Sequence, residues 1–198
     1  MPTRLQQLSL LAALPILLAG CSTVKAGGPT AALPPPASSP AAPTGTSMTG
    51  MTTLVAPSES AQMVCGPEIR ADVATILSLK TPPPTATSWV NQLYTCTYRL
   101  SGGPLAVSVK ESGDVTSARS YFDGLRRRLG PTQPLRGLDS LGLPAFETPN
   151  GNVAFLKDDK TLQIDATALP TEVNSQHRQR SDLAYTLATD ILGCWSGK

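Results

Sequence analysis

The sequence predicts an α+β fold, with an antiparallel sheet of about five strands and helices packed on one face, in the order α-β-β-α-β-β-β-α. Three features predict it. Apolar residues recur at helical spacing in three segments, they alternate in the segments between these, and short turns with Gly, Asn or Asp join the alternating segments. We expect this fold as a single globular domain over residues 59–198.

The first expected helix lies in "CGPEIRADVATILSLK", where Pro67 stands at the first helical position. A proline is favourable there because the N–H group that it lacks would have no partner inside the helix. One face carries Ile69, Val73, Ile76 and Leu77. The proline run in "KTPPPT" ends the helix.

Two alternating segments follow this helix and predict a hairpin. In "SWVNQLYTCTYRL" one side of the strand carries Tyr94, Cys96, Tyr98 and Leu100. After "SGGP" a second run places Leu105, Val107 and Val109 together. A Gly-Gly turn of this kind joins antiparallel strands.

The clearest helix is "DVTSARSYFDGLRRRLG", with Asp114 as its N-cap and Gly130 as its C-cap. Its expected apolar face carries Val115, Ala118, Phe122, Leu125 and Leu129.

Three strands and a helix complete the predicted domain. Strands at 145–148 and 153–156 flank the turn "PNGN", and a third strand at 161–168 follows "KDDK". The third strand directs Leu162, Ile164, Ala166 and Ala168 inward. The last helix lies in "SDLAYTLATDILGCW", with Ser181 as its expected N-cap.

The first 58 residues predict export and anchoring rather than folded structure. Residues 1–20 combine Arg4 with the apolar run "LSLLAALPILLAG", as in a signal peptide. The run ends in "LAGC", which resembles the lipobox of bacterial lipoprotein precursors and implies a lipid-modified Cys21; an ordinary signal peptide with a chance cysteine is the alternative. Residues 21–58 are rich in Pro, Ala and Thr, carry Lys25 as their only charge, and predict a disordered tether.

The predicted domain carries no net charge. All 14 acidic residues fall within 59–198, together with every Lys and Arg except Arg4 and Lys25, which leaves 14 basic residues. A balanced domain without a basic stripe argues against nucleic acid as a partner.

The whole chain resembles the small cell-envelope lipoproteins of actinobacteria. The resemblance rests on the lipobox, the Pro/Ala-rich tether, a cysteine before a helix, a second cysteine in "CTY" and the segment "GLDSLGLPAFETPNGNVAFL". It implies an extracytoplasmic protein that the lipid on Cys21 holds at the outer face of the cell membrane. It implies no particular activity.

Cys65, Cys96 and Cys194 lie in the predicted domain, where an oxidising compartment permits a disulfide. We favour Cys65 with Cys96, because that bond would join the first helix to the first strand. Cys65 with Cys194 competes with it, and spacing alone does not decide. If Cys194 is left over, it is either a partly buried apolar residue or a reactive thiol.

Four aromatic residues are the candidate ligand-binding set: Trp89, Tyr94, Tyr98 and Phe122. They could line an apolar pocket, although core packing explains them equally well. Arg119 and the run Arg126 to Arg128 form a basic edge that suggests an anionic headgroup, and a solvated helix face is the alternative.

No catalytic residue, metal site or cofactor is expected. His177 is the only histidine and stands in a polar stretch without ligand or nucleophile spacing, and the chain has no G-x-S-x-G or H-E-x-x-H motif. The sequence therefore favours a non-catalytic, membrane-anchored lipoprotein that binds an apolar or amphiphilic ligand or an envelope protein. An accessory subunit of an envelope complex is the second hypothesis. A cell-wall or lipid hydrolase is third, and a carboxylate pair with a raised pKa in a cleft would favour it.

Overall fold

The computed structural model describes residues 56–135, 137–138, 141–174 and 176–196. The expected signal peptide, Cys21 and the expected tether up to residue 55 lie outside the described residues. Within the described part, no helix has both the length and the apolar character needed to cross a membrane.

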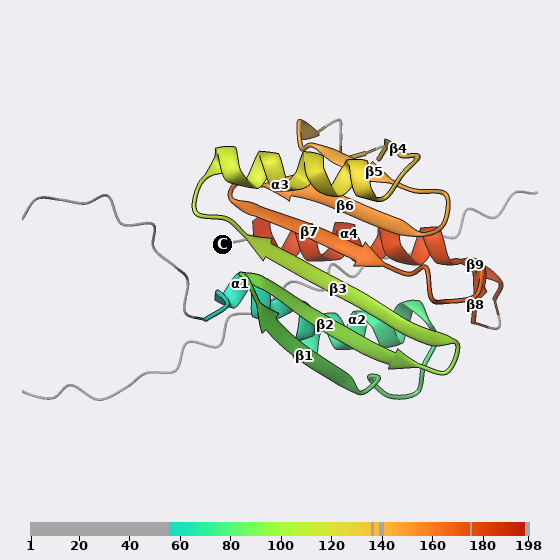
Figure 1. The fold of residues 1–198 in the computed structure, drawn as a ribbon. Helices are drawn as coiled ribbons and strands as arrows, with labels where there is room; N and C mark the ends of the chain where they lie inside the picture. Colours follow the sequence, from blue (N-terminus) through green and yellow to red (C-terminus); the bar gives the residue numbers. More distant parts are fainter. Residues whose placement is uncertain (1–55, 136, 139–140, 175, 197–198) are drawn as a thin grey trace, which may run out of the picture. The chain divides into compact units, whose positions relative to one another are not determined.

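A seven-stranded antiparallel sheet forms the centre of the domain, in the order β1-β2-β3-β7-β6-β5-β4 (Figure 1). Its strands are β1 (Thr85–Val90), β2 (Leu93–Leu100), β3 (Gly103–Glu111), β4 (Gln133–Pro134), β5 (Ala145–Glu147), β6 (Asn152–Lys157) and β7 (Lys160–Asp165). The helices are α1 (Glu59–Gln62), η1 (Met63–Cys65), α2 (Pro67–Ile76), α3 (Val115–Arg128) and α4 (Arg180–Ser196), and a small hairpin pairs β8 (Glu172–Val173) with β9 (Arg178–Gln179). The α+β class with an antiparallel sheet is confirmed, with seven strands in the sheet rather than about five.

One extra strand arises where the sequence suggested a single strand. The segment "SWVNQLYTCTYRL" reverses direction at Asn91 and Gln92, whose φ angles are +52° and +59°. Two consecutive left-handed residues make a tight hairpin turn, and asparagine tolerates this conformation better than most residues. The turn pairs β1 with β2 and sets Trp89 opposite Tyr94.

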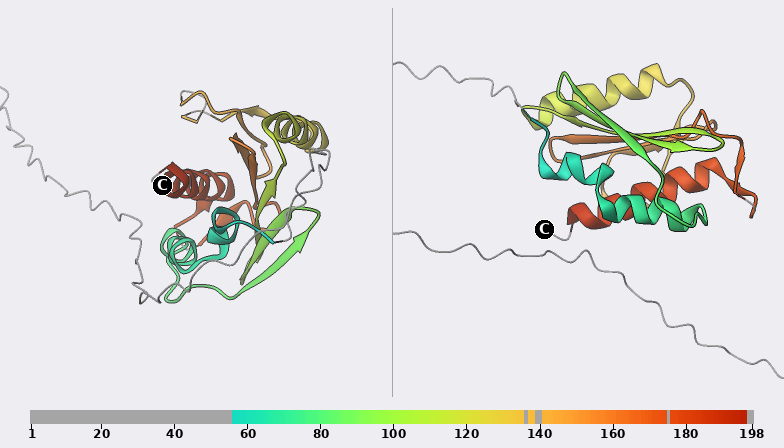
Figure 2. Two further views of the ribbon diagram at one scale, coloured as in Figure 1. Left: turned by 90° about the vertical axis from the view of Figure 1, so that its left-hand side faces the viewer. Right: turned by 90° about the horizontal axis from the view of Figure 1, so that it is seen from below.

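Helices cover both faces of the sheet, not one as expected. Val153 and Phe155 of β6 join the main core under α2 and α4, whereas Ala154 and Leu156 join a second cluster under α3. Figure 2 shows α3 on the opposite side of the strands from α2 and α4. Strand β6 explains why both faces are covered. Successive side chains of a strand point to opposite faces, and both faces of β6 are apolar.

Helix α3 has the predicted N-cap but a shorter apolar face. Asp114 accepts a hydrogen bond from the Ser117 N–H at 2.9 Å. The C-cap is Leu129, and the expected Gly130 follows it with φ +81°. The residues buried against the sheet are Ala118, Phe122 and Leu125. Val115, expected on the same face, is 65% exposed at the first helical position.

The C-terminal elements differ from the expectation at their ends. Strand β7 stops at Asp165, so Ala168 is exposed rather than inward. Helix α4 begins at Arg180, which places Ser181 inside its first turn instead of at the cap. The buried face of α4 carries Leu183, Ala184, Leu187, Ala188, Ile191, Leu192 and Trp195.

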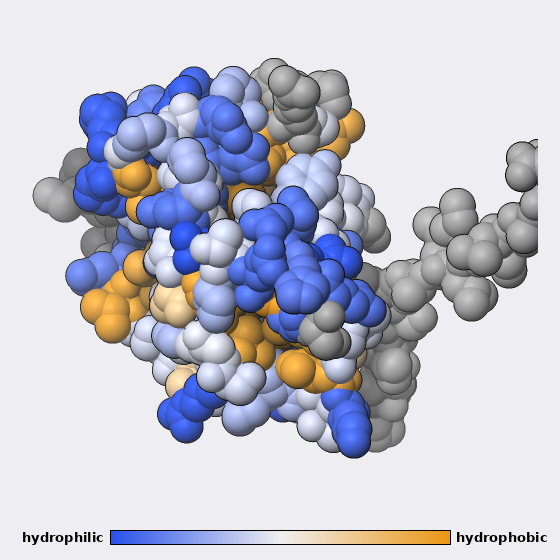
Figure 3. Space-filling model, turned by 90° about the vertical axis from the view of Figure 1, so that its right-hand side faces the viewer, coloured by the Kyte–Doolittle hydropathy of each residue, from blue (hydrophilic) through white to orange (hydrophobic). Residues whose placement is uncertain are grey.

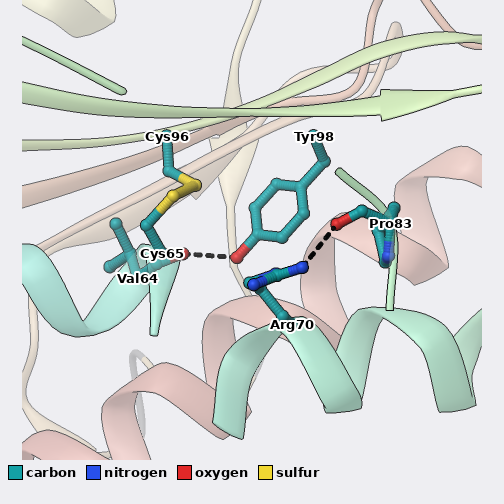
Figure 4. The surroundings of a disulfide bond; sticks show 6 residues. All are labelled: Val64, Cys65, Arg70, Pro83, Cys96 and Tyr98. Carbon is teal, nitrogen blue, oxygen red and sulfur yellow. Dashed lines mark hydrogen bonds between the residues drawn. A yellow bond between two sulfur atoms is a disulfide. The ribbon is translucent and has the colours of Figure 1, made fainter. Parts of the chain in front are cut away.

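A disulfide ties the N-terminal helices to strand β2 (Figure 4). It joins Cys65 to Cys96, the pairing that the sequence favoured, with 5.4 Å between the Cα atoms. Two strand residues further, the buried Tyr98 hydroxyl donates a hydrogen bond to the Val64 carbonyl. Cys194 lies outside the disulfide, partly buried against the main core. The 3₁₀ turn η1 is thereby held directly on the sheet.

A buried carboxylate fixes the start of the described domain. Glu111, at the end of β3, is 1% exposed and accepts hydrogen bonds from the Ser58 N–H, at 3.2 Å, and from the Ser58 hydroxyl. Ser58 in turn accepts from the Ala61 N–H as the N-cap of α1. The chain therefore enters the fold at the end of β3.

We predict that the double substitution Cys65→Ala/Cys96→Ala lowers the free energy of unfolding by about 3 to 4 kcal/mol, since the bond closes a loop across 31 positions. Urea unfolding followed by tryptophan fluorescence measures it. A reductant is expected to weaken the wild-type protein and Cys194→Ala equally, and to leave the double variant unchanged. An equal effect of reductant on the double variant would contradict the assignment.

Candidate functional site

A pocket of about 390 Å³ opens at the end of the sheet that carries the β2–β3 turn. Three segments line it: 77–84 after α2, 99–102 at the end of β2, and 169–174 leading into β8. Figure 3 shows this end of the domain, where hydrophobic surface lies between groups of hydrophilic side chains. The volume falls within the range of small-molecule sites, about 300 to 1,000 Å³.

The first wall follows from the way α2 ends. Ser78 adopts a left-handed conformation with φ +55°, and the Leu79 N–H donates to the Ala74 carbonyl at 2.8 Å, which closes the helix. The three prolines that follow hold the chain extended, and the buried Pro83 accepts a hydrogen bond from Arg70 at 3.3 Å. This segment runs past the end of β2 as a fixed wall.

The other two walls meet because of a glycine. Gly103 has φ +134°, and a Cβ atom there would lie 2.3 Å from the Ala168 carbonyl oxygen. Only glycine permits this approach, which brings the β2–β3 turn against the segment before β8. The Asn174 side-chain amide donates to the Ile76 carbonyl at 3.4 Å and links that segment back to α2.

The pocket is apolar inside and charged at its margin. Its apolar lining consists of Leu77, Leu79, Pro83, Pro84, Leu100, Leu169, Pro170 and Val173. The polar lining consists of Lys80, Thr81, Arg99, Ser101, Gly102, Glu172 and Asn174. Among these described residues, no Ser or Thr hydroxyl bonds to a histidine or a carboxylate. The arrangement therefore suits binding of an apolar group with a polar end.

The predicted aromatic set does not form this pocket. Trp89, Tyr94 and Tyr98 pack on the main-core side of β1 and β2, away from the pocket lining. Tyr98 is fully buried, and burial raises the pKa of its hydroxyl well above the ordinary value. Phe122 lies across the sheet with its ring 5.1 Å from that of Phe146. The structure thus supports the packing alternative for Tyr94 and Tyr98, whereas Phe122 packs on Phe146 and also lines a pocket.

Phe122 lines a second pocket, of about 320 Å³, between α3 and the segment around 142–145. Its margin is more polar: Arg119 pairs with Asp123 at 3.4 Å, and the Arg126 Nε donates to the Thr132 hydroxyl at 3.0 Å. Arg128 turns away and stacks on Tyr121, 5.6 Å from the ring centre. The arginine run therefore diverges rather than forming one clamp, as its helical spacing indicated.

A carboxylate pair lies between α2 and α4. Burial and the neighbouring Glu68 raise the pKa of Asp72, and burial and Asp72 raise the pKa of Asp190. Neither residue lines either described pocket. The raised pKa values that would favour a hydrolase are therefore present, at a site outside these two pockets. In the described ranges, no group of three His, Cys, Asp or Glu residues could hold a metal ion.

Sequence patterns did not predict the pocket, because "KTPPPT" and "SGGP" carry only the signals of breaks between elements. These breaks are the segments that form two of the walls. His177 was expected to be a solvated loop residue; the structure has it exposed, with its Nδ1 atom 2.6 Å from the Glu172 carboxylate at the pocket margin. No spacing rule connects these segments, since the fold alone brings them together.

Comparisons of the chain with protein-family models, with curated proteins and with solved structures found no match. The resemblance to envelope lipoproteins therefore stays an expectation.

We predict that Asp190→Asn raises the free energy of unfolding at pH 7, because it removes the cost of burying a charged carboxylate and the repulsion from Asp72. The gain is expected to be a few tenths to about 1 kcal/mol, because solvent partly screens both effects. The raised pKa values mean that the folded protein binds protons that the unfolded chain releases. Ionised Asp190 therefore lowers the stability of the folded protein in full above its raised pKa. This loss of stability disappears as the pH falls toward the ordinary pKa of 3.8.

Urea unfolding of variant and wild type between pH 4 and 7 measures this difference, which is expected to shrink toward the acid end. Asp182→Asn, in the exposed first turn of the same helix, removes the same charge away from Asp72 and serves as control. A gain at pH 7 that is equal for both variants would contradict the coupling of Asp190 with Asp72.

Proposed function

We propose that the chain is a membrane-anchored lipoprotein of the cell envelope whose domain binds an amphiphilic ligand and catalyses no reaction. The observation that carries the proposal is the pocket of about 390 Å³, with its apolar walls and charged margin. Apolar surface that leaves water there contributes roughly 25 cal/mol per Å², while the polar end of the ligand stays at the solvent-exposed margin.

The disulfide supports the location part of this proposal. A bond between Cys65 and Cys96 persists in an oxidising compartment outside the cytoplasm. This agrees with the export signal and the lipid attachment expected at Cys21, which lies outside the described residues. Two acyl chains on that cysteine would suffice for stable attachment.

An accessory subunit of an envelope complex is the second candidate, supported by a bare part of the sheet. Helix α3 packs on β6 and β7, and none of the described helices packs on the same face of β1. There Ala86 and Ser88 are exposed, and Val90 is 60% exposed. An envelope protein that covers this face would make the domain a docking module without a small-molecule ligand.

To test the ligand, the full chain is produced in an actinobacterial host, extracted in mild detergent, and examined by native mass spectrometry for retained amphiphiles. We predict that Leu79→Glu lowers the retained fraction about tenfold or more, because Leu79 is 40% exposed in the pocket wall and the apolar chain of a ligand would cover the new carboxylate and remove its water. Leu141→Glu is the matched control, since Leu141 is 67% exposed and lines neither described pocket. A wild-type chain without any retained amphiphile would favour the accessory-subunit candidate instead.

To test the anchor, membrane and soluble fractions of cells fed an alkyne-tagged fatty acid are compared. We predict that the wild-type chain carries the tag and sediments with membranes, and that Cys21→Ser loses the tag and leaves the membrane fraction. Cys194→Ser changes neither property. Tagging that persists in Cys21→Ser would show that the lipobox assignment is wrong.

A further inference from the structure

Glu172, the acidic residue at the pocket margin, is already bound by side chains of its own hairpin. Of the described lining residues, Lys80, Arg99 and Glu172 are charged. One carboxylate oxygen of Glu172 lies 2.6 Å from Nδ1 of His177, and the other accepts a hydrogen bond from the Gln179 amide at 3.5 Å. The β8–β9 hairpin thus holds this carboxylate with its own side chains.

The two cations at the margin have no such partner. Among the described residues, the ion pairs of arginine and lysine join Arg119 to Asp123, Lys157 to Asp158 and Lys160 to Asp159. Neither Lys80 nor Arg99 takes part, and both are exposed. The mouth therefore presents two cations that form no ion pair with a described carboxylate, together with the single carboxylate of Glu172, which His177 and Gln179 hold.

The backbone places both cations on the pocket walls. Lys80 directly follows Leu79, whose N–H closes α2. The Arg99 N–H donates to the Pro84 carbonyl at 2.9 Å, which joins the strand that carries Arg99 to the proline wall. Their side chains lie next to apolar lining while their charged ends remain in solvent, as is usual for long basic side chains.

We propose that the pocket selects amphiphiles with an anionic headgroup, a carboxylate or a phosphate, which Lys80 and Arg99 hold while the apolar chain enters the pocket. The inference rests on the proposed function, because it assumes that the pocket takes an amphiphile. It assigns headgroup recognition to these two residues and not to the divergent arginine run of α3. Hydrogen bonds between a cation and an anionic headgroup are stronger than those to a neutral one.

The test uses the full chain in phosphatidylcholine nanodiscs with a diazirine-bearing palmitate and its methyl ester at equal concentration. After illumination, mass spectrometry quantifies the label on peptides that contain 77–84 and 99–102. The wild-type protein is expected to be labelled about threefold to tenfold more by the carboxylate than by the ester. This is the preference that solvent-exposed ion pairs of the ligand carboxylate with Lys80 and Arg99 would give. In Lys80→Gln/Arg99→Gln this ratio is expected to fall close to one.

Arg126→Gln/Arg127→Gln is the matched control, because it removes two cations from α3 and is expected to keep the wild-type ratio. Inorganic phosphate in tenfold excess is expected to leave most of the preference, since it lacks an apolar chain. Loss of the preference with phosphate would indicate a small-anion site and overturn the proposal. Equal labelling by both probes would overturn the headgroup assignment and leave the proposed function standing, whereas no labelling of these peptides would contradict both.

Discussion

The docking of the N-terminal helices onto strand β2 is the constraint on which the rest of the domain depends. The Cys65–Cys96 disulfide and the hydrogen bond from Tyr98 to Val64 hold η1 against the strand, and Glu111 holds the start of α1. Helix α2 starts from this fixed point, and its C-terminal end delivers the segment 77–84 to the far end of β2. The pocket exists because that end of α2 is placed there.

The same constraint separates the entry of the chain from the pocket. Glu111 ends β3 and binds Ser58, whereas Gly103 begins the strand next to the pocket turn. Nine residues of extended strand place these two points about 25 Å apart. In a chain anchored upstream of Ser58, the pocket would open at the end of the sheet remote from the attachment.

Local sequence patterns predicted the helices and strands, whereas contacts between distant residues determine how these elements pack and where the pocket forms. The apolar spacing in α2 and the N-cap at Asp114 were enough to predict helices α2 and α3, because each signal lies within a few neighbouring residues. The position of α3 depends on β6, which is apolar on both sides. Its sequence therefore does not show which face of the sheet a helix covers. The pocket depended on Gly103 approaching Ala168, a contact between residues 65 positions apart that no local pattern encodes.

The zero net charge expected for the domain conceals an uneven distribution of charge. Asp72 and Asp190 concentrate negative charge between α2 and α4, at a cost that their raised pKa values reflect. Lys80 and Arg99 place two positive charges at the pocket mouth, against the one negative charge of Glu172. An overall balance argues against the long-range attraction that a nucleic acid needs, but a headgroup in the pocket responds to charges within a few Å. The neutrality that argues against a polyanion therefore remains compatible with recognition of a single anionic group.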